Sequence, residues 1–165
     1  MNNSANRVAV ALGSNLGDSK RTLETAVVTL NQDSQIECLQ CSSWYRTKPI
    51  GPPQPDYMNG CVLLSTSNLT PHQLLKKLQD IESLHGRERK ERWGARTLDL
   101  DIILFDDLII DEADLTIPHL RMQERAFVLV PLAEISPEWL DPRTGETILK
   151  LRDKIKTEEV VRVER

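Results

Sequence analysis

The chain has 165 residues, of which 39% are hydrophobic and 28% are charged. This length and composition predict a single globular domain over residues 1–165, with a core at about 7–152 and tails that fray. The net charge of −4 argues against a general nucleic-acid surface, which usually carries a basic excess. No apolar run reaches membrane-spanning length, and the three cysteines lack the spacing of a disulfide framework. We therefore expect a cytoplasmic protein without nucleic-acid or membrane partners.

The first part of the chain predicts two strands with one helix between them. VAVALG (8–13) is rich in β-formers and predicts a strand. It ends in GSNLGD, which lacks the Lys-Ser/Thr of a Walker A loop, so a turn with a helix cap is its plainest interpretation. Asp18 or Ser19 can cap a helix that runs to about residue 31. A strand is expected next at 35–45, and the Pro-rich stretch 47–56 then predicts an extended loop.

The second part predicts further alternation of strands and helices. A strand is expected at 57–67, and Thr70 caps a helix that follows it and ends near residue 84. A strand at 99–105, a hairpin or turn at 108–119, a helix at about 123–135 and a short terminal helix complete the chain. The order β-α-β-β-α-β before the hairpin predicts an α/β (α+β) fold of the ferredoxin-like sandwich type. Its sheet should be antiparallel, with helices on its faces and a C-terminal extension.

Two aspartates, Asp99 and Asp101, interrupt the apolar run LDLDIILF with one leucine between them. Residues i and i+2 of a strand face the same side, so both carboxylates should project to one face. Leu98, Leu100 and Ile102 should project to the other. Two anions this close repel each other unless a cation joins them, and paired oxygen ligands favour Mg²⁺. Salt bridges to nearby arginines are the alternative interpretation.

A basic segment, GRERKERWGAR (86–96), precedes these aspartates and contains Arg87, Arg89, Arg92 and Arg96. Guanidinium groups neutralise phosphate oxygens in bidentate fashion, and carboxylates hold metal ions that bridge them. The combination indicates chemistry on a nucleoside triphosphate without identifying the acceptor. Trp93, among the arginines, either anchors the loop or stacks on a ligand.

Two weaker patterns have ordinary structural interpretations. Cys38 and Cys41 form a C-x-x-C inside a predicted strand, where residues i and i+3 face opposite ways. A shared zinc ion or an easy disulfide is then geometrically awkward, and we expect both thiols to be packing residues. His119 is at the end of the predicted hairpin, in a stretch that includes Arg121 and Arg125, so a phosphate contact and a turn role are equally open.

Three segments, YRTKPIGPPQPDYMN (45–59), ERWGARTLDLDIILF (91–105) and IPHLRMQERAFVLVPLAEI (117–135), closely resemble the hydroxymethyl-dihydropterin pyrophosphokinase (HPPK) family of folate biosynthesis, as does GSNLGD. The likeness covers nearly the whole chain, in the same order. It implies transfer of pyrophosphate from the co-substrate ATP to the hydroxymethyl group of 6-hydroxymethyl-7,8-dihydropterin, with release of AMP.

The resemblance also implies roles for individual residues. Two Mg²⁺ ions would be held by Asp99 and Asp101, and catalysis would involve these two together with Arg87, Arg89, Arg92 and Arg96. ATP contacts are implied for Gln79, Glu82, Arg89, Arg92, Trp93, Arg96, Ile102, Thr116, His119 and Arg125. Pterin contacts are implied for Thr47, Lys48, Ile50, Tyr57, Asn59, Trp93 and Phe127, with Tyr57 and Phe127 as the stacking pair.

Two other functions fit the residues less well. A different Mg²⁺-dependent nucleotidyl- or glycosyl-transferase can also carry a D-x-D site. A non-catalytic binding module would keep the arginines for an anionic partner, but it would not need both aspartates. The segment 45–59 with Tyr57 and Asn59 favours the pterin enzyme over the other transferase, where it has no role. A monomer is expected, since no long apolar surface stripe is left over.

Overall fold

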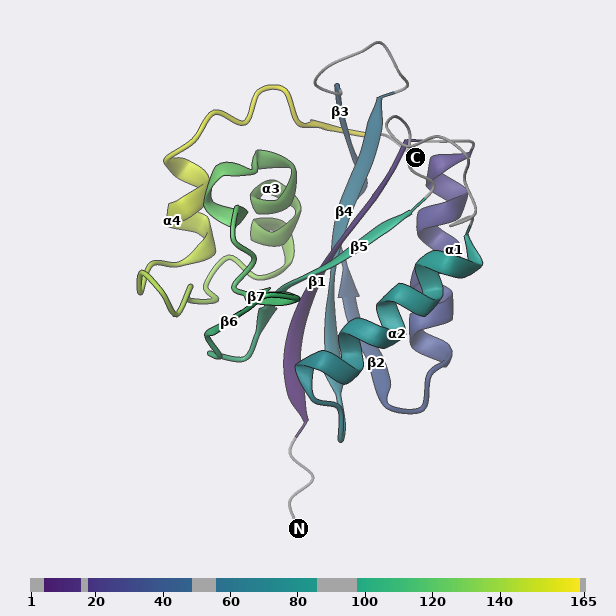
Figure 1. Ribbon diagram of the computed structural model, residues 1–165. Helices are drawn as coiled ribbons and strands as arrows, with labels where there is room; N and C mark the ends of the chain where they lie inside the picture. The colour runs from purple at the N-terminus through teal and green to yellow at the C-terminus, as the bar shows by residue number, and fades with distance from the viewer. Residues whose placement is uncertain (1–4, 16–17, 49–55, 86–97, 164–165) are drawn as a thin grey trace.

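The computed structural model describes residues 5–15, 18–48, 56–85 and 98–163 (Figure 1). Its strands are β1 (Asn6–Ser14), β2 (Ile36–Cys41), β3 (Tyr45–Thr47), β4 (Tyr57–Thr66), β5 (Asp99–Phe105), β6 (Ile110–Glu112), β7 (Leu115–Ile117) and β8 (Val161–Arg162). Its helices are α1 (Ser19–Gln32), α2 (Pro71–Leu84), α3 (Ala126–Ile135) and α4 (Ile148–Asp153), with a 3₁₀ turn at Met122–Glu124.

One antiparallel sheet forms the centre of the molecule. Its strand order is β5-β1-β4-β3-β8, and β2 also pairs with β4. Helices α1 and α2 cover one face of this sheet, and α3 and α4 lie against the other (Figure 1). The expected mixed α/β architecture, with an antiparallel sheet and helices on its faces, is therefore confirmed. Among the described helices, none combines the length and apolar character needed to cross a membrane.

The two long helices begin where the sequence predicts. The Asp18 side chain accepts a hydrogen bond from the backbone N–H of Arg21 at 3.2 Å, so Asp18 is the cap of α1. Thr70 and Gln73 form a reciprocal capping box at the start of α2. Each cap satisfies backbone donors that the first turn of a helix leaves unpaired.

The core has two parts, one on each face of the sheet, and the alternation along β1 separates them. Val8, Val10 and Leu12 point to what we call the α1–α2 face, where α2 adds three buried residues of its helical stripe. Ala9 belongs to the cluster on the opposite α3–α4 face, and Ala11 packs against that cluster. The central strand thus presents larger side chains to one face than to the other.

The predicted strand at 35–45 is wrong as a single element, because it is interrupted between Cys41 and Tyr45. Ser42 exchanges two hydrogen bonds with Cys61 of β4, each 2.9 Å long. The Trp44 ring then lies so close to Gly60 that a Cβ at this glycine would be 2.4 Å from ring carbon Cε3. These contacts with β4 bend the chain, so β3 starts anew at Tyr45.

The expected orientation of the two neighbouring cysteines is also wrong. A bulge in β2 shifts the pairing with β4, so Cys38 lies opposite Leu64 and Cys41 lies opposite Val62. Both partners belong to the core of the α1–α2 face, and both cysteines therefore point to that side. They are free thiols, and burial raises the pKa of Cys38. Cys38 packs against the core of the α1–α2 face, as predicted, whereas Cys41 is exposed, so the packing role predicted for Cys41 is wrong.

Three hydrogen bonds to Glu134, which we call the polar clamp, join the start of β3 to helix α3. Glu134 of α3 accepts hydrogen bonds from the Ser43 backbone N–H at 3.0 Å, the Ser43 hydroxyl at 2.9 Å and the Tyr45 hydroxyl at 2.7 Å. Burial and the bond to Glu134 together raise the pKa of Tyr45 to about 12. Ser43 and the first residue of β3, Tyr45, are thereby fixed against α3.

The C-terminal segment, expected to fray, instead ends in the short strand β8. Tyr45 pairs with Arg162 and Arg46 pairs with Val161, and the Val163 backbone N–H donates to the Trp44 carbonyl at 2.8 Å. The helix expected at about 123–135 likewise differs in detail, because it divides at Arg125 into the 3₁₀ turn and α3.

Candidate active site

A cavity of about 810 Å³ opens on the α3–α4 face of the sheet. Its floor comes from the end of β1 and the starts of β4 and β5, and its sides come from β3, α3 and the segment after α4. The volume lies within the range of about 300–1,000 Å³ that is typical of small-molecule sites.

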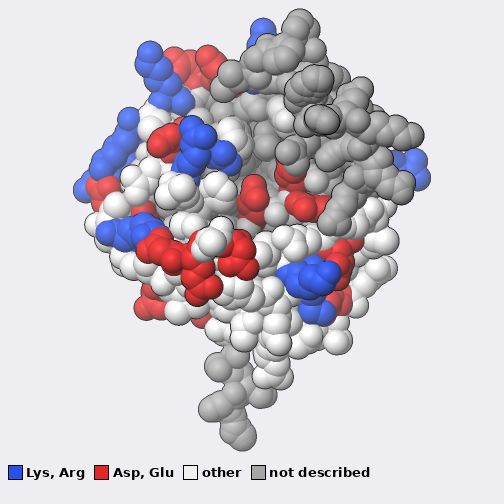
Figure 2. All heavy atoms as spheres, viewed as in Figure 1, with Lys and Arg blue, Asp and Glu red and all other residues white. Residues whose placement is uncertain are grey.

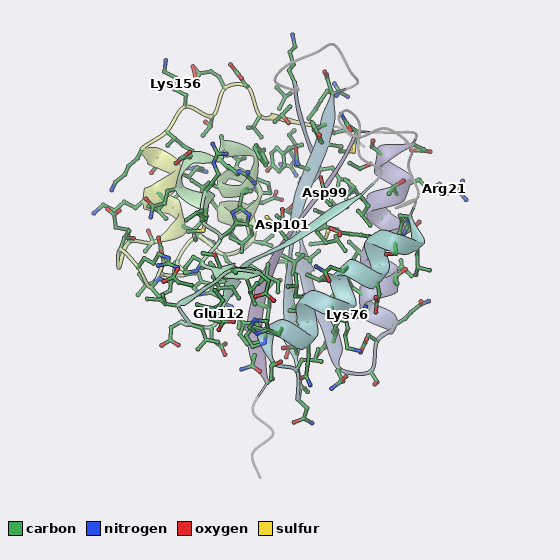
Figure 3. The ribbon with its side chains drawn as sticks, viewed as in Figure 1. Arg21, Lys76, Asp99, Asp101, Glu112 and Lys156 are labelled. Carbon is green, nitrogen blue, oxygen red and sulfur yellow. The ribbon has the colours of Figure 1, made fainter. Side chains whose placement is uncertain are left out.

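Asp99 and Asp101 lie side by side on this floor. The pairing of β1 with β5 places Asp101 opposite Ala11 and Asp99 opposite Gly13, and all four residues line the cavity. Figure 3 shows both aspartates on β5 at the centre of the molecule, and Figure 2 shows acidic atoms in the same central region of this view. The intervening Leu100 is 3% exposed and faces the other core. The sequence-based assignment of faces on this strand is therefore confirmed.

The two carboxylates form a donor set that suits a hard divalent cation. They come from adjacent same-face positions of one strand, so the backbone fixes their relative placement. Each is half-buried and opens on the cavity. Carboxylate oxygens with room for further oxygen ligands are what Mg²⁺ prefers. The residues present therefore fit Mg²⁺.

Asn59 supplies an amide to the same floor, and Gly13 makes room for it. The two residues lie opposite each other in the pairing of β1 with β4. A Cβ at Gly13 would be 2.8 Å from Nδ2 of Asn59, and the Thr47 hydroxyl donates to Oδ1 of Asn59 at 3.1 Å. The role of Gly13 was not foreseen, because GSNLGD was interpreted as a turn. Gly13 was predicted as the last residue of the strand at 8–13, and β1 extends past it to Ser14, where the glycine lets the amide approach.

Two aromatic rings border the cavity from different elements. Tyr57 starts β4, and Phe127 lies in the first turn of α3. Both are only half-buried, and both line the cavity. The Arg125 guanidinium carbon lies 5.5 Å from the centroid of the Phe127 ring, which places a cation beside this aromatic face. Flat heteroaromatic ligands stack on such rings.

His119 lies beside the cavity, within electrostatic range of Asp101. Burial lowers the pKa of His119, the charges of Arg125 and Arg121 lower it further, and Asp101 opposes them. Its Nδ1 accepts a hydrogen bond from the Arg121 backbone N–H at 3.2 Å. The imidazole is thus biased toward its neutral form, with one nitrogen engaged by the adjacent turn.

Several residues implied as nucleotide contacts are not brought to the cavity. Gln79 is exposed on α2, Thr116 is on β7, and Ile102 is 4% exposed in the opposite core. Glu82 accepts a hydrogen bond from the Leu100 backbone N–H at 2.7 Å, so it ties α2 to β5. Ile50, Arg87, Arg89, Arg92, Trp93 and Arg96 fall outside the described residues.

The cavity also has walls that were not predicted from sequence motifs. Arg121 and Glu124 line it from the 3₁₀ turn and the residue before it. Residues 156–160 contribute four further lining positions from the C-terminal segment. A charged segment such as KTEEV resembles an ordinary solvated tail, so no pattern in it distinguishes a pocket wall.

Comparison with known proteins places this chain in a family. The family model for 7,8-dihydro-6-hydroxymethylpterin-pyrophosphokinase matches residues 9–137. The 2-amino-4-hydroxy-6-hydroxymethyldihydropteridine pyrophosphokinase of Synechocystis sp. is 53% identical over 146 residues, which cover 88% of this chain and 74% of that protein. The Haemophilus influenzae enzyme of the same name is 46% identical over 136 residues, covering 82% of this chain and 84% of that protein.

Solved structures agree on the fold. A crystal structure of wild-type Plasmodium falciparum HPPK-DHPS with SDX-DHP superposes with a TM-score of 0.73 at 16% identity. It covers 95% of this chain, and this chain spans 47% of that longer one. The match over residues 9–137 and the identity to the two bacterial enzymes lead to one conclusion: the chain belongs to the HPPK family.

Proposed function

We propose that this protein transfers a pyrophosphoryl group from ATP to the hydroxymethyl group of 6-hydroxymethyl-7,8-dihydropterin, giving the pterin diphosphate and AMP. The substrate hydroxyl loses its proton to solvent and its oxygen forms a bond to the β-phosphorus, while the bond from that phosphorus to the α,β-bridging oxygen breaks and this oxygen leaves as part of AMP. The observation that carries the proposal is one cavity that unites the Asp99–Asp101 pair with two aromatic rings and the Asn59 amide. This combination matches a phosphorylated co-substrate at one end and a flat heterocycle at the other.

Asp99 and Asp101 are the residues that would hold Mg²⁺, and we propose two ions. When bound, the metal neutralises phosphate charge and acts as a Lewis acid toward the reacting oxygens. The chain's own contribution is position: β5 fixes both carboxylates on the floor, directly beside Ala11 and Gly13 of β1. Because the reacting groups are held in place before the reaction, the entropy loss of bringing separate molecules together does not add to the reaction barrier.

The pterin ring is proposed to stack between Tyr57 and Phe127. The Asn59 amide presents a donor and an acceptor to the amide-like edge of the ring, and its bond from Thr47 fixes its orientation. Lys48 and Ile50 are proposed as backbone contacts at the same end. A flat ring held by two faces and one edge leaves its hydroxymethyl group as the part free to face the phosphates.

The nucleotide is proposed to bind on the Asp99 and Asp101 side, with Arg125 and His119 near its phosphates. The basic segment is proposed to supply the remaining cationic contacts, namely Arg87, Arg89, Arg92, Trp93 and Arg96. Gln79, Glu82, Ile102 and Thr116 remain proposed ATP contacts, and any contact from Ile102 would have to come from its backbone, because its side chain is buried in the α1–α2 core.

The proposal also includes the arrangement of the fold, the oligomeric state and the location in the cell. The strand order β5-β1-β4 with β2 and β3 beyond it, together with crossovers through α1 and α2, supports a ferredoxin-like arrangement. We also propose a monomeric, cytoplasmic enzyme. The alternative of another D-x-D transferase is not favoured, because the family match extends over the pterin-side residues as well as over the aspartates.

The test is AMP release measured with ATP, Mg²⁺ and hydroxymethyl-dihydropterin. AMP should form only when the pterin is present, and Asp101→Ala should lower the rate by about a hundredfold or more. Asp107→Ala is the matched control, because this carboxylate is exposed in the turn after β5 and should be dispensable. Wild-type protein that binds ATP but releases no AMP with the pterin would exclude this acceptor.

A further inference from the structure

The C-terminal segment 156–163, which we call the strap, leaves α4 and returns to the central sheet. It crosses above α3 and reaches the sheet beside β3 (Figure 1). It lies beyond residues 9–137, the part of the chain that the family model matches. Any role of the strap at the site would therefore add to the features that define the family.

The strap is held at both ends. Before it, Ile155 packs against the core cluster of the α3–α4 face. At its far end, β8 pairs with β3, and Val163 donates its backbone N–H to the Trp44 carbonyl at 2.8 Å. Because the strap is fixed at both ends, the residues between the two anchors have little freedom to move away from the sheet.

Between these anchors, the strap forms a wall of the large cavity. Lys156, Glu158, Glu159 and Val160 all line it. Val160 also lines a second cavity of about 280 Å³, together with Val130 of α3 and Ile155. Val160 is half-buried and borders both cavities.

Position and charge indicate which substrate meets this wall. Val160 directly precedes the residues of β8 that pair with Arg46 and Tyr45, which brings it alongside Thr47 at the end of the cavity proposed for the pterin. Two of the four lining residues of the strap are glutamates, and Glu carboxylates repel a triphosphate. The uncharged pterin ring suits this side better than ATP does. In Figure 3, Lys156 lies well away from the Asp99–Asp101 pair.

We infer that the strap is part of the pterin subsite, and that Val160 is a specificity-determining wall residue for the flat bicyclic ring. This inference rests on the proposed function. The Val160 side chain closes the cavity beside Thr47, and the docking of β8 on β3 keeps that wall in place. ATP binds at the other end and is insensitive to the strap.

The test compares two identical substitutions at adjacent positions. Val160→Ala removes two methyl groups from the wall, and it should weaken binding of hydroxymethyl-dihydropterin about threefold. Val161→Ala is the control, because its side chain is 55% exposed and does not line the cavity. Binding is measured by titration calorimetry with the pterin, and separately with a non-hydrolysable ATP analogue and Mg²⁺, which should bind both variants as it binds wild type.

A second pair tests the anchor instead of the wall. Val163→Pro removes the backbone N–H that donates to the Trp44 carbonyl, whereas Val163→Ala keeps this donor. We expect about tenfold weaker pterin binding in the proline variant, a raised KM for pterin with little change in kcat, and wild-type behaviour in the alanine variant. Equal pterin affinity in wild type, Val160→Ala and Val163→Pro would overturn the role of the strap while leaving the proposed function intact. A wild-type protein that binds no pterin would overturn both.

Discussion

The two faces of the central sheet use the same strands for opposite purposes. On the α1–α2 face, β1 presents Val8, Val10 and Leu12 to a closed apolar core. On the α3–α4 face, the alternate positions are Ala9, Ala11 and Gly13. Their side chains are two methyl groups and, at the cavity end of the strand, a single hydrogen. The cavity thus arises from small residues on a central strand, with a tightly packed core directly beneath it. A rigid floor of this kind suits a site that works by positioning.

The difference between the two faces is tested most strongly by a carboxylate placed on the α1–α2 face. Leu100→Asp would put a carboxylate into the α1–α2 core, where Leu100 is 3% exposed. An unpaired buried charge costs several kcal/mol, of the order of the whole stability of a domain, so this variant should not fold. Circular dichroism and the yield of soluble protein would show it. A cooperatively folded Leu100→Asp protein would contradict the closed character of that face.

The converse change, one residue along, should spare the fold and remove the activity. Asp101→Leu takes away one of two like charges that neighbour each other on the floor, so Tm should equal or exceed that of the wild type. AMP release in the presence of the pterin should nevertheless fall by about a hundredfold or more. Thermal unfolding and the AMP assay are run on the same preparation. A large loss of stability in this variant would mean that the carboxylate is structural.

A smaller change fills the space that the cavity face leaves empty. Gly13→Ala places a methyl group 2.8 Å from Nδ2 of Asn59, so the amide must move and its bond from Thr47 is strained. We expect about tenfold weaker pterin binding and a modest change in stability. In a double-mutant cycle with Asn59→Ala, the two effects should not add, because both act through the same amide. Strict additivity would show that Gly13 acts elsewhere.

The smallest effect concerns the polar clamp that holds the cavity face together. Burial alone would raise the pKa of Glu134, but the hydrogen bonds from Tyr45 and Ser43 outweigh it and hold the pKa below its ordinary 4.5. A lowered folded-state pKa contributes stability above about pH 4.5, and this contribution is lost as the pH falls through the folded-state value. Glu134→Gln should therefore be less stable than wild type at pH 7, by up to about 1 kcal/mol, with the difference shrinking below pH 4.

The same variant gives an independent signal from the tyrosine. The pKa of Tyr45 is raised to about 12 by burial first and then by its bond to Glu134. Without the carboxylate, this pKa should move down toward the ordinary value of a phenol. An ultraviolet pH titration of wild type and Glu134→Gln measures the shift, and coincident curves would show that the clamp does not form in solution.

Local signals in the sequence predicted the elements well. Caps at Asp18 and Thr70 fixed the helix starts, because capping depends on side chains only a few residues away. The alternation at Asp99 and Asp101 predicted their common face, because the period of a strand is a property of its own backbone. These features needed no knowledge of the partner strands.

Features that depend on distant partners were missed. The bulge that turns Cys38 and Cys41 to one side is defined by the register against β4, and the break after Cys41 depends on the Trp44 ring lying on Gly60. β8 exists only because β3 offers it an edge, which a charged segment does not reveal. Periodicity within one segment cannot encode any of these.

The candidate site shows the same division. Motif resemblance selected Thr47, Tyr57, Asn59 and Phe127, which come from β3, β4 and α3 and meet in one cavity. It did not indicate Gly13, whose role is visible only once the strand opposite it is known. Nor did it indicate the strap, because no motif covers that part of the chain.

The pairing of β8 with β3 has a consequence for the behaviour of the protein at high concentration. β3 has β4 on one side, and β8 occupies its other side, so the backbone groups of Tyr45 and Arg46 already have partners there. Removal of the last residues would leave an unpaired strand edge next to Trp44, and such edges recruit strands from other copies. The C-terminus therefore also acts as a guard against edge-to-edge aggregation. We therefore expect a protein shortened before β8 to self-associate more readily than the full chain.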